Sequence, residues 1–118
     1  MTDRELLELA AKAAGIVGNW ERDKAYVQER YYFKVPYDNQ NMLTGFQWNP
    51  ITDDGEALRL AVKVGILVAP PAYTGGWQAT ASAKADETPW VDETSGSHEE
   101  ATRRAIVRAA AEIGKAMQ

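Results

Sequence analysis

The sequence predicts an α+β domain in which three helices pack around a small, mainly antiparallel sheet, an α/β/α layered sandwich. Alanine-rich segments near both ends of the chain have the apolar period of amphipathic helices, and a more apolar helix lies between them. Short stretches rich in strand-forming residues and bounded by glycine or proline separate the helices. The chain of 118 residues is long enough for one domain, 1–118, with its own core.

The first helix is predicted over Asp3–Ala14. Thr2 and Glu5 have the spacing of a capping box, in which each side chain bonds the backbone N–H of the other residue. Gly15 suits the left-handed residue that ends a helix, and Ile16 can then fold back onto the last turn. The apolar face consists of Leu6, Leu9, Ala10 and Ala13, widened by Leu7, Ala11 and Ala14.

The central helix is predicted over Asp53–Val64, and its composition makes it the element around which the others are arranged. Glu56, Arg59 and Lys63 form one narrow polar stripe, and Gly65 suits the end of the helix. A helix with so little polar surface is covered on more than one side, so we expect its neighbours to enclose it. The residues expected to be covered are Ala57, Leu58, Leu60, Ala61, Val62 and Val64.

The last helix is predicted from its cap residue Ser97 to about Ala116, with Glu100 at the second capping-box position. Acidic and basic residues four positions apart favour ion pairs along its exposed face. The expected pairs are Glu99–Arg103, Glu100–Arg104 and Arg108–Glu112. The expected core stripe is Ile106, Ala109, Ala110, Ile113 and Met117.

Four strands are predicted between the helices, over Tyr31–Val35, Thr44–Trp48, Ile66–Ala69 and Trp77–Lys84. Apolar and polar residues alternate in Trp77–Lys84, which is typical of a half-buried strand. We expect this strand to pair antiparallel with Ile66–Ala69. The stretch Asp86–Gly96 is rich in acidic and turn-forming residues and is predicted to be a linker.

The bulk composition excludes several classes of protein. The chain has no cysteine, so disulfides and thiolate metal sites are excluded. No apolar run approaches the ~18 residues that a membrane span requires, and the charged first helix is not expected to be a secretory signal. A net charge of −4 with a pI near 5.0 argues against non-specific nucleic-acid binding, which requires concentrated positive charge.

The sequence offers little to build a catalytic or metal site. The single histidine, His98, falls in the first turn of the last helix, where we expect it to be exposed. Without cysteine the nucleophile–base pair of a cysteine hydrolase cannot form, and an exposed His98 is not expected to act as the general base of a serine hydrolase. Asp53 and Asp54 are weak candidates for a hard cation such as Mg²⁺, although capping and the helix dipole also account for them. We therefore expect no cofactor and no enzymatic activity.

The binding candidates are aromatic residues at element ends or in loops, together with two arginines: Trp90, Tyr73, Trp77, Trp48, Arg103 and Arg104. Trp90 and Tyr73 lie in predicted polar loops, where a large ring often marks a contact with a partner. Trp48 and Trp77 are explained either by core packing or by binding. The two arginines either form a solvated, ion-paired face or contact a phosphate or an acidic partner.

Three stretches of the sequence resemble a family of small tailed-bacteriophage proteins known as the phage ABA (α/β/α) sandwich domain. They are DRELLELAAKAAGI at 3–16, WNPITDDGEALRLAVKVG at 48–65 and ATRRAIVRAAAEI at 101–113. The run WNP-x-TDDG is more specific than a generic helix start. The resemblance implies a layered fold and a phage gene product in the host bacterial cytoplasm, and it implies no activity.

Three functions are compatible with these features. The first is a non-enzymatic phage accessory protein that binds a host or phage partner protein through its aromatic loops. The second is a protein that binds a small nucleotide signal of host defence, which would require a pocket lined by aromatic residues and arginines. The third is a metal-dependent hydrolase built on Asp53 and Asp54. We expect neither membrane association nor a general affinity for nucleic acid.

Overall fold

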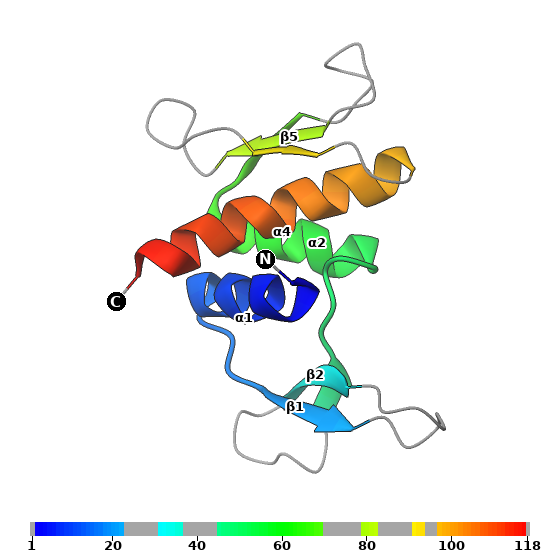
Figure 1. Cartoon of the computed structure of the whole chain (residues 1–118), viewed down its shortest axis with the longest axis vertical. Helices are drawn as coiled ribbons and strands as arrows, with labels where there is room; N and C mark the ends of the chain where they lie inside the picture. The colour runs from blue at the N-terminus through cyan, green and yellow to red at the C-terminus, as the bar shows by residue number, and fades with distance from the viewer. Residues whose placement is uncertain are drawn as a thin grey trace.

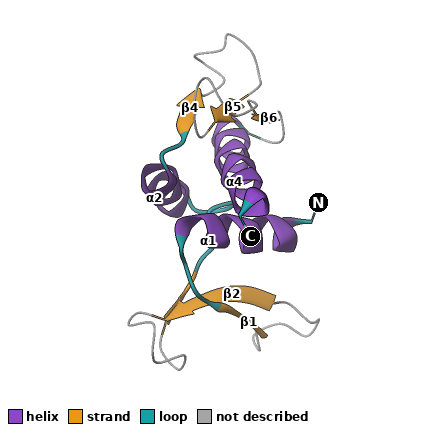
Figure 2. Cartoon of the chain, turned by 90° about the vertical axis from the view of Figure 1, so that its left-hand side faces the viewer, coloured by secondary structure: helices purple, strands orange, loops and turns teal. Residues whose placement is uncertain are grey.

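The computed structural model describes residues 2–22, 31–36, 45–69, 79–82, 91–93 and 97–117. Within these ranges, three helices form a central layer, and a three-stranded antiparallel sheet lies on each side of it (Figures 1 and 2). The predicted α+β class, with helices packed against antiparallel strands, is confirmed. The strands form two sheets rather than one, because the chain crosses the helical layer through its central helix before the second set of strands begins.

Helix α1 (Asp3–Ala14) has the predicted bounds. The hydroxyl of Thr2 accepts a hydrogen bond from the Glu5 N–H at 3.2 Å. Gly15 has a φ of 69°, a left-handed conformation that glycine adopts without a steric penalty. The Ile16 N–H donates back to a carbonyl of the last turn at 2.9 Å, so the predicted helix end is confirmed. The buried residues are Leu6, Leu7, Ala10, Ala11 and Ala14, with Leu9 and Ala13 only half-buried.

Helix α2 (Asp54–Val64) also begins and ends where the sequence predicts, within one residue. The Asp53 carboxylate caps it by accepting a hydrogen bond from the Glu56 N–H at 2.9 Å. Gly65 ends the helix with a φ of 80°. Both ends are predictable because each signal acts within a single helical turn.

The prediction that α2 is enclosed by its neighbours is wrong. Ala57, Leu60 and Ala61 are buried, but the side chains of Leu58 and Val62 are 64% and 75% exposed. The reason is the position of α2 at one edge of the helical layer (Figure 2). Only one of its sides meets the other two described helices, so the opposite side faces solvent.

The enclosed helix is instead α4 (His98–Ala116), which packs against α1, α2 and all three strands of the second sheet. The Ser97 hydroxyl caps it as predicted, accepting from the Glu100 N–H at 3.1 Å. Of the predicted core stripe, Ile113 is only half-buried and Met117 is exposed. The buried residues are Ala101, Ala105, Ile106, Val107, Ala109, Ala110, Ala111 and Gly114.

The first sheet pairs its strands antiparallel in chain order: β1 (Asn19–Arg22), β2 (Tyr31–Pro36) and β3 (Gly45–Gln47). The second and third of these match strands that the sequence predicts. Phe33 of β2 packs its ring 5.4 Å from that of Trp20 and 5.8 Å from that of Trp48. These rings join the first sheet to the core that the helices share.

The second sheet has the same antiparallel order: β4 (Leu67–Ala69), β5 (Ala79–Ser82) and β6 (Val91–Glu93). The predicted pairing of the first two strands is confirmed, with Val68 opposite Ala81. The prediction of a linker over Asp86–Gly96 is wrong for Val91–Glu93, which pairs with β5. Two acidic residues in three give almost no local strand signal, and the neighbouring strand supplies the hydrogen bonds that define β6.

Candidate functional site

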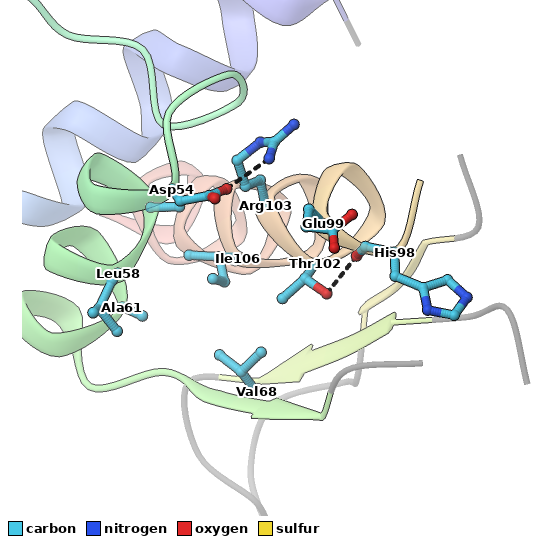
Figure 3. A pocket seen from close by; sticks show the side chains of 10 residues that line it. Asp54, Leu58, Ala61, Val68, His98, Glu99, Thr102, Arg103 and Ile106 are labelled. Atoms are coloured by element: carbon cyan, nitrogen blue, oxygen red, sulfur yellow. Dashed lines mark hydrogen bonds and ion pairs between the residues drawn. The ribbon is translucent and has the colours of Figure 1, made fainter. Parts of the chain in front are cut away.

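An apolar hollow of about 380 Å³ opens between α2, the first half of α4 and β4 (Figure 3). We call it the α2–α4 hollow. Val68 of β4 points towards Ile106 of α4, and Leu58 and Ala61 line the side formed by α2 (Figure 3). Polar residues stand around this apolar lining: Asp54, His98, Glu99, Thr102 and Arg103.

Leu58 lines this hollow, Val62 follows one turn further along α2, and their two exposed side chains form what we call the α2 ridge. Residues four positions apart lie on the same side of a helix, so the two side chains are neighbours on the surface. Leu58 belongs both to the ridge and to the lining of the hollow, which makes the apolar surface continuous. Single exposed apolar residues are common, whereas a continuous apolar surface more often marks an interaction site.

Arg103 holds the two helical walls of the hollow together. Its Nε donates to the Ile51 carbonyl at 2.7 Å, and its Nη1 donates to the Asp54 carboxylate at 2.6 Å (Figure 3). The side chain is only 19% exposed, so these charge-assisted bonds are partly shielded from water. Arg103 therefore fixes the start of α4 against the turn that precedes α2, in place of the predicted pair with Glu99.

The acidic residues considered as a weak metal site have structural partners. Asp53 caps α2, and Asp54 pairs with Arg103. Glu56, in the same turn, pairs with Arg59 at 2.6 Å. In the described ranges, no group of three or more histidine, aspartate or glutamate residues is arranged to hold a metal ion. These contacts favour the capping and ion-pair interpretation of Asp53 and Asp54 over the metal interpretation.

A second pocket, of about 300 Å³, lies between the start of α1 and the first sheet, and we call it the Arg4 pocket. The guanidinium carbon of Arg4 stands 4.6 Å from the ring centre of Trp20 and 6.0 Å from that of Tyr31. Glu8 fixes this arrangement by accepting from the Trp20 indole N–H at 2.7 Å and by lying 3.5 Å from Arg4. The other aromatic residues of the lining are Tyr32, Phe33 and Trp48.

The structure separates the binding candidates that the sequence grouped. Arg103 lies at the hollow, but Arg104 bonds both carboxylate oxygens of Asp3 at 3.0 and 3.1 Å and so joins α4 to α1. Trp48 is 2% exposed and belongs to the core, where it also lines the Arg4 pocket. The remaining candidates lie outside the described residues: Trp90, Tyr73 and Trp77.

Sequence reasoning missed both surfaces that the structure brings together. The ridge had a signal, because its two residues and Asp54 repeat every four positions, and an acidic residue at the start of a stripe suggests exposure. The Arg4 pocket had no such signal, because it forms only when α1 packs against the first sheet. His98 is exposed as predicted, at the start of α4 beside the hollow.

Comparison of the chain with protein-family models, with curated proteins and with solved structures finds no significant match. Among the helices that the structure describes, none is long and apolar enough to cross a membrane. Function is therefore inferred from the residues of this chain and from their arrangement.

Proposed function

We propose that this protein is a non-catalytic binding protein that docks a partner protein on the α2 ridge and the α2–α4 hollow. The observation that carries the proposal is that Leu58, which is 64% exposed, lines the apolar hollow, and that Val62, one turn further along α2, is 75% exposed. A ridge next to a recess offers a partner both a projection and a cavity to fill. The aromatic loops that the sequence predicts for this role, with Trp90, Tyr73 and Trp77, lie outside the described residues.

The energetics require the partner to use the hollow as well as the ridge. Burying an exposed leucine or valine contributes about 1.5–3 kcal/mol each. Association costs on the order of 4–15 kcal/mol in lost freedom of movement. Two side chains therefore cannot sustain a complex, and a partner that fills the hollow is needed to supply the remaining apolar contact.

The polar groups around the hollow support binding rather than catalysis. The guanidinium of Arg103 is engaged by Ile51 and Asp54. The Thr102 hydroxyl donates to the His98 carbonyl at 2.7 Å. These contacts maintain the walls of the site and do not assemble a nucleophile with a base.

The resemblance to the phage ABA sandwich family adds a biological setting to this proposal. In that setting the protein is a bacteriophage accessory protein that acts in the host bacterial cytoplasm, and its partner is a host or phage protein. The three stretches that carry the resemblance include residues 48–65, which contain α2 and its ridge.

The proposal is tested by comparing three forms of the protein as bait for partner capture. The wild type should retain a partner that Leu58→Asp loses, because the charge disrupts an apolar contact. Val17→Asp is the matched control, since Val17 is 69% exposed and lies outside the hollow. A partner retained equally by all three forms would argue against docking at the ridge.

A second candidate function is the binding of a small ligand with a planar ring, such as a nucleotide, in the Arg4 pocket. The observation that favours it is the guanidinium of Arg4 held beside two rings, of which Tyr31 is half exposed. Stacking on an aromatic ring contributes about 1–3 kcal/mol per base. Thermal shift against a panel of nucleotides, with and without Mg²⁺, tests it, because a bound ligand raises the melting temperature. Tyr31→Ala should remove any shift that arises at this pocket.

A further inference from the structure

A second arginine lies next to the half-exposed tyrosine of the Arg4 pocket. Arg22 of β1 is directly opposite Tyr31 of β2. Residues opposite one another in a ladder point to the same face of the sheet, with their Cβ atoms about 4.5–5.5 Å apart. Arg22 is exposed, and within the described ranges no hydrogen bond or ion pair engages its guanidinium. The Tyr31 ring therefore has two arginines as neighbours, Arg4 from α1 and Arg22 from the adjacent strand.

Arg4 is fixed in place, but the protein does not use its terminal nitrogens. The guanidinium lies over the Trp20 ring at 4.6 Å, and its Nε is 3.5 Å from a carboxylate oxygen of Glu8. Among the described residues, none accepts a hydrogen bond from either Nη atom of Arg4, and the side chain is 56% exposed. A positioned guanidinium whose terminal N–H groups remain open can bind two oxygens of a phosphate or carboxylate at once.

The charges of the pocket balance in pairs, except for that of Arg22. Asp3 lines the pocket, and both of its carboxylate oxygens accept from Arg104 at 3.0 and 3.1 Å. Arg4 also lines it and pairs with Glu8. Arg22 adds a positive charge that has no pair among the described residues, although the whole chain has a net charge of −4. The local field beside Tyr31 therefore favours a ligand with a negative group.

We propose that the Arg4 pocket takes a small ligand in which a planar ring is joined to an oxyanion, either a phosphate or a carboxylate. The ring stacks on Tyr31, and the oxyanion lies between the guanidinium groups of Arg4 and Arg22. The inference rests on the second candidate function and adds the charged end of the ligand to it. The pocket volume of about 300 Å³ is at the lower end for ligand sites, which suits a single ring system with one anionic group, such as a mononucleotide.

The test is calorimetric titration with pairs of ligands that share a ring and differ in charge. The pairs are AMP with adenosine, UMP with uridine, and phenylacetate with phenylacetamide. The charged member of at least one pair should bind about 10-fold more tightly than its neutral counterpart, the effect of one hydrogen bond to a charged group. The pair that shows the difference identifies the oxyanion as a phosphate or a carboxylate. Added salt should reduce the difference, because both arginines are exposed.

Arg22→Gln is the decisive variant. It should bring the two affinities of a pair close together and leave the affinity for the neutral member unchanged, because Arg22 is exposed at the end of β1. Arg4→Gln should act in the same direction, but it also removes the contact with Trp20. Arg59→Gln is the matched control, since Arg59 is 67% exposed and does not line the Arg4 pocket, so the difference should persist.

Equal affinities within every pair for the wild type, or a difference that Arg22→Gln leaves intact, would overturn the inference. If the neutral members still bind and Tyr31→Ala abolishes their binding, the candidate function stands and only the anionic end of the ligand is wrong. If no member of any pair binds, or if Tyr31→Ala leaves every affinity unchanged, the pocket is not a site for ring ligands, and both proposals are wrong.

Discussion

Helices α2 and α4 show how differently two helices of one layer can be buried. α2 has the more apolar sequence, yet it lies at the edge of the layer and leaves Leu58 and Val62 in solvent. α4 carries many charged residues, yet Ala105, Val107 and Ala110 along it are fully buried. Apolar content alone therefore does not identify the helix that its neighbours enclose.

The difference lies in the size of the side chains. Alanine and glycine let a neighbouring backbone approach closely, so α4 can be covered by α1, α2 and the second sheet together. Its arginines reach outwards between these neighbours, where Arg103 bonds Asp54 and Arg104 bonds Asp3. The larger residues of α2 fill the core on one side only. The four predictions below test this contrast.

The most damaging change should be Leu60→Asp on the buried side of α2. Leu60 is 2% exposed, and an aspartate there would be a buried charge without a partner. We expect a loss of at least about 4 kcal/mol in the free energy of unfolding, enough to prevent stable folding. Circular dichroism and thermal melting measure it. A variant that melts with the wild type would mean that α2 is rotated from the orientation described.

Gly114→Ala should be the next most harmful, although alanine is the better helix former. A Cβ at Gly114 would overlap the Leu9 carbonyl oxygen and lie 2.8 Å from its carbon, so α1 and α4 would have to separate. We expect a loss of about 1–3 kcal/mol in chemical denaturation, as for other overpacked cores.

Gly55→Ala is the matched control for this change, because a Cβ there lies 3.3 Å from the flexible end of Arg59 and from Asp53. It should stay within about 0.5 kcal/mol of the wild type or gain slightly from helix propensity. Equal effects at the two glycines would contradict the close approach of α1 and α4.

Arg103→Ala should have an intermediate effect, because it removes two bonds between α4 and the start of α2. Hydrogen bonds to charged groups contribute about 1.5–3 kcal/mol when shielded, and partial exposure reduces this to about 1–2 kcal/mol here. Arg59→Ala is the comparison, since its side chain is 67% exposed and its pair with Glu56 contributes less than about 1 kcal/mol. Urea titration of both variants should separate them clearly, and identical midpoints would remove the structural role assigned to Arg103.

Leu58→Asp should change the stability of the monomer least, by less than about 0.5 kcal/mol, because Leu58 is exposed. Its effect should be confined to the capture of a partner at the ridge. A monomer that melts well below the wild type would place Leu58 in the core and argue against the ridge. Together, Leu58→Asp and Leu60→Asp test the exposed and the buried side of α2.

The sequence by itself determined where the helices begin and end. Thr2 and Ser97 cap two of the three described helices as predicted, Asp53 caps the third, and Gly15 and Gly65 end two of them. Two strands of each sheet were also predictable. These signals are local, because a cap or a left-handed glycine satisfies backbone groups within one turn of the chain.

The tertiary structure decided which faces are covered and which groups meet. The enclosure of α4 joins the two ends of the chain. The pairing of Val91–Glu93 and the position of Arg4 beside Trp20 and Tyr31 depend on how successive elements fold back on one another. The hollow likewise forms only where α2, α4 and β4 meet. The apolar period of a helix shows that one of its sides must be buried. How much of the helix surface is buried depends on how the neighbouring elements pack against it.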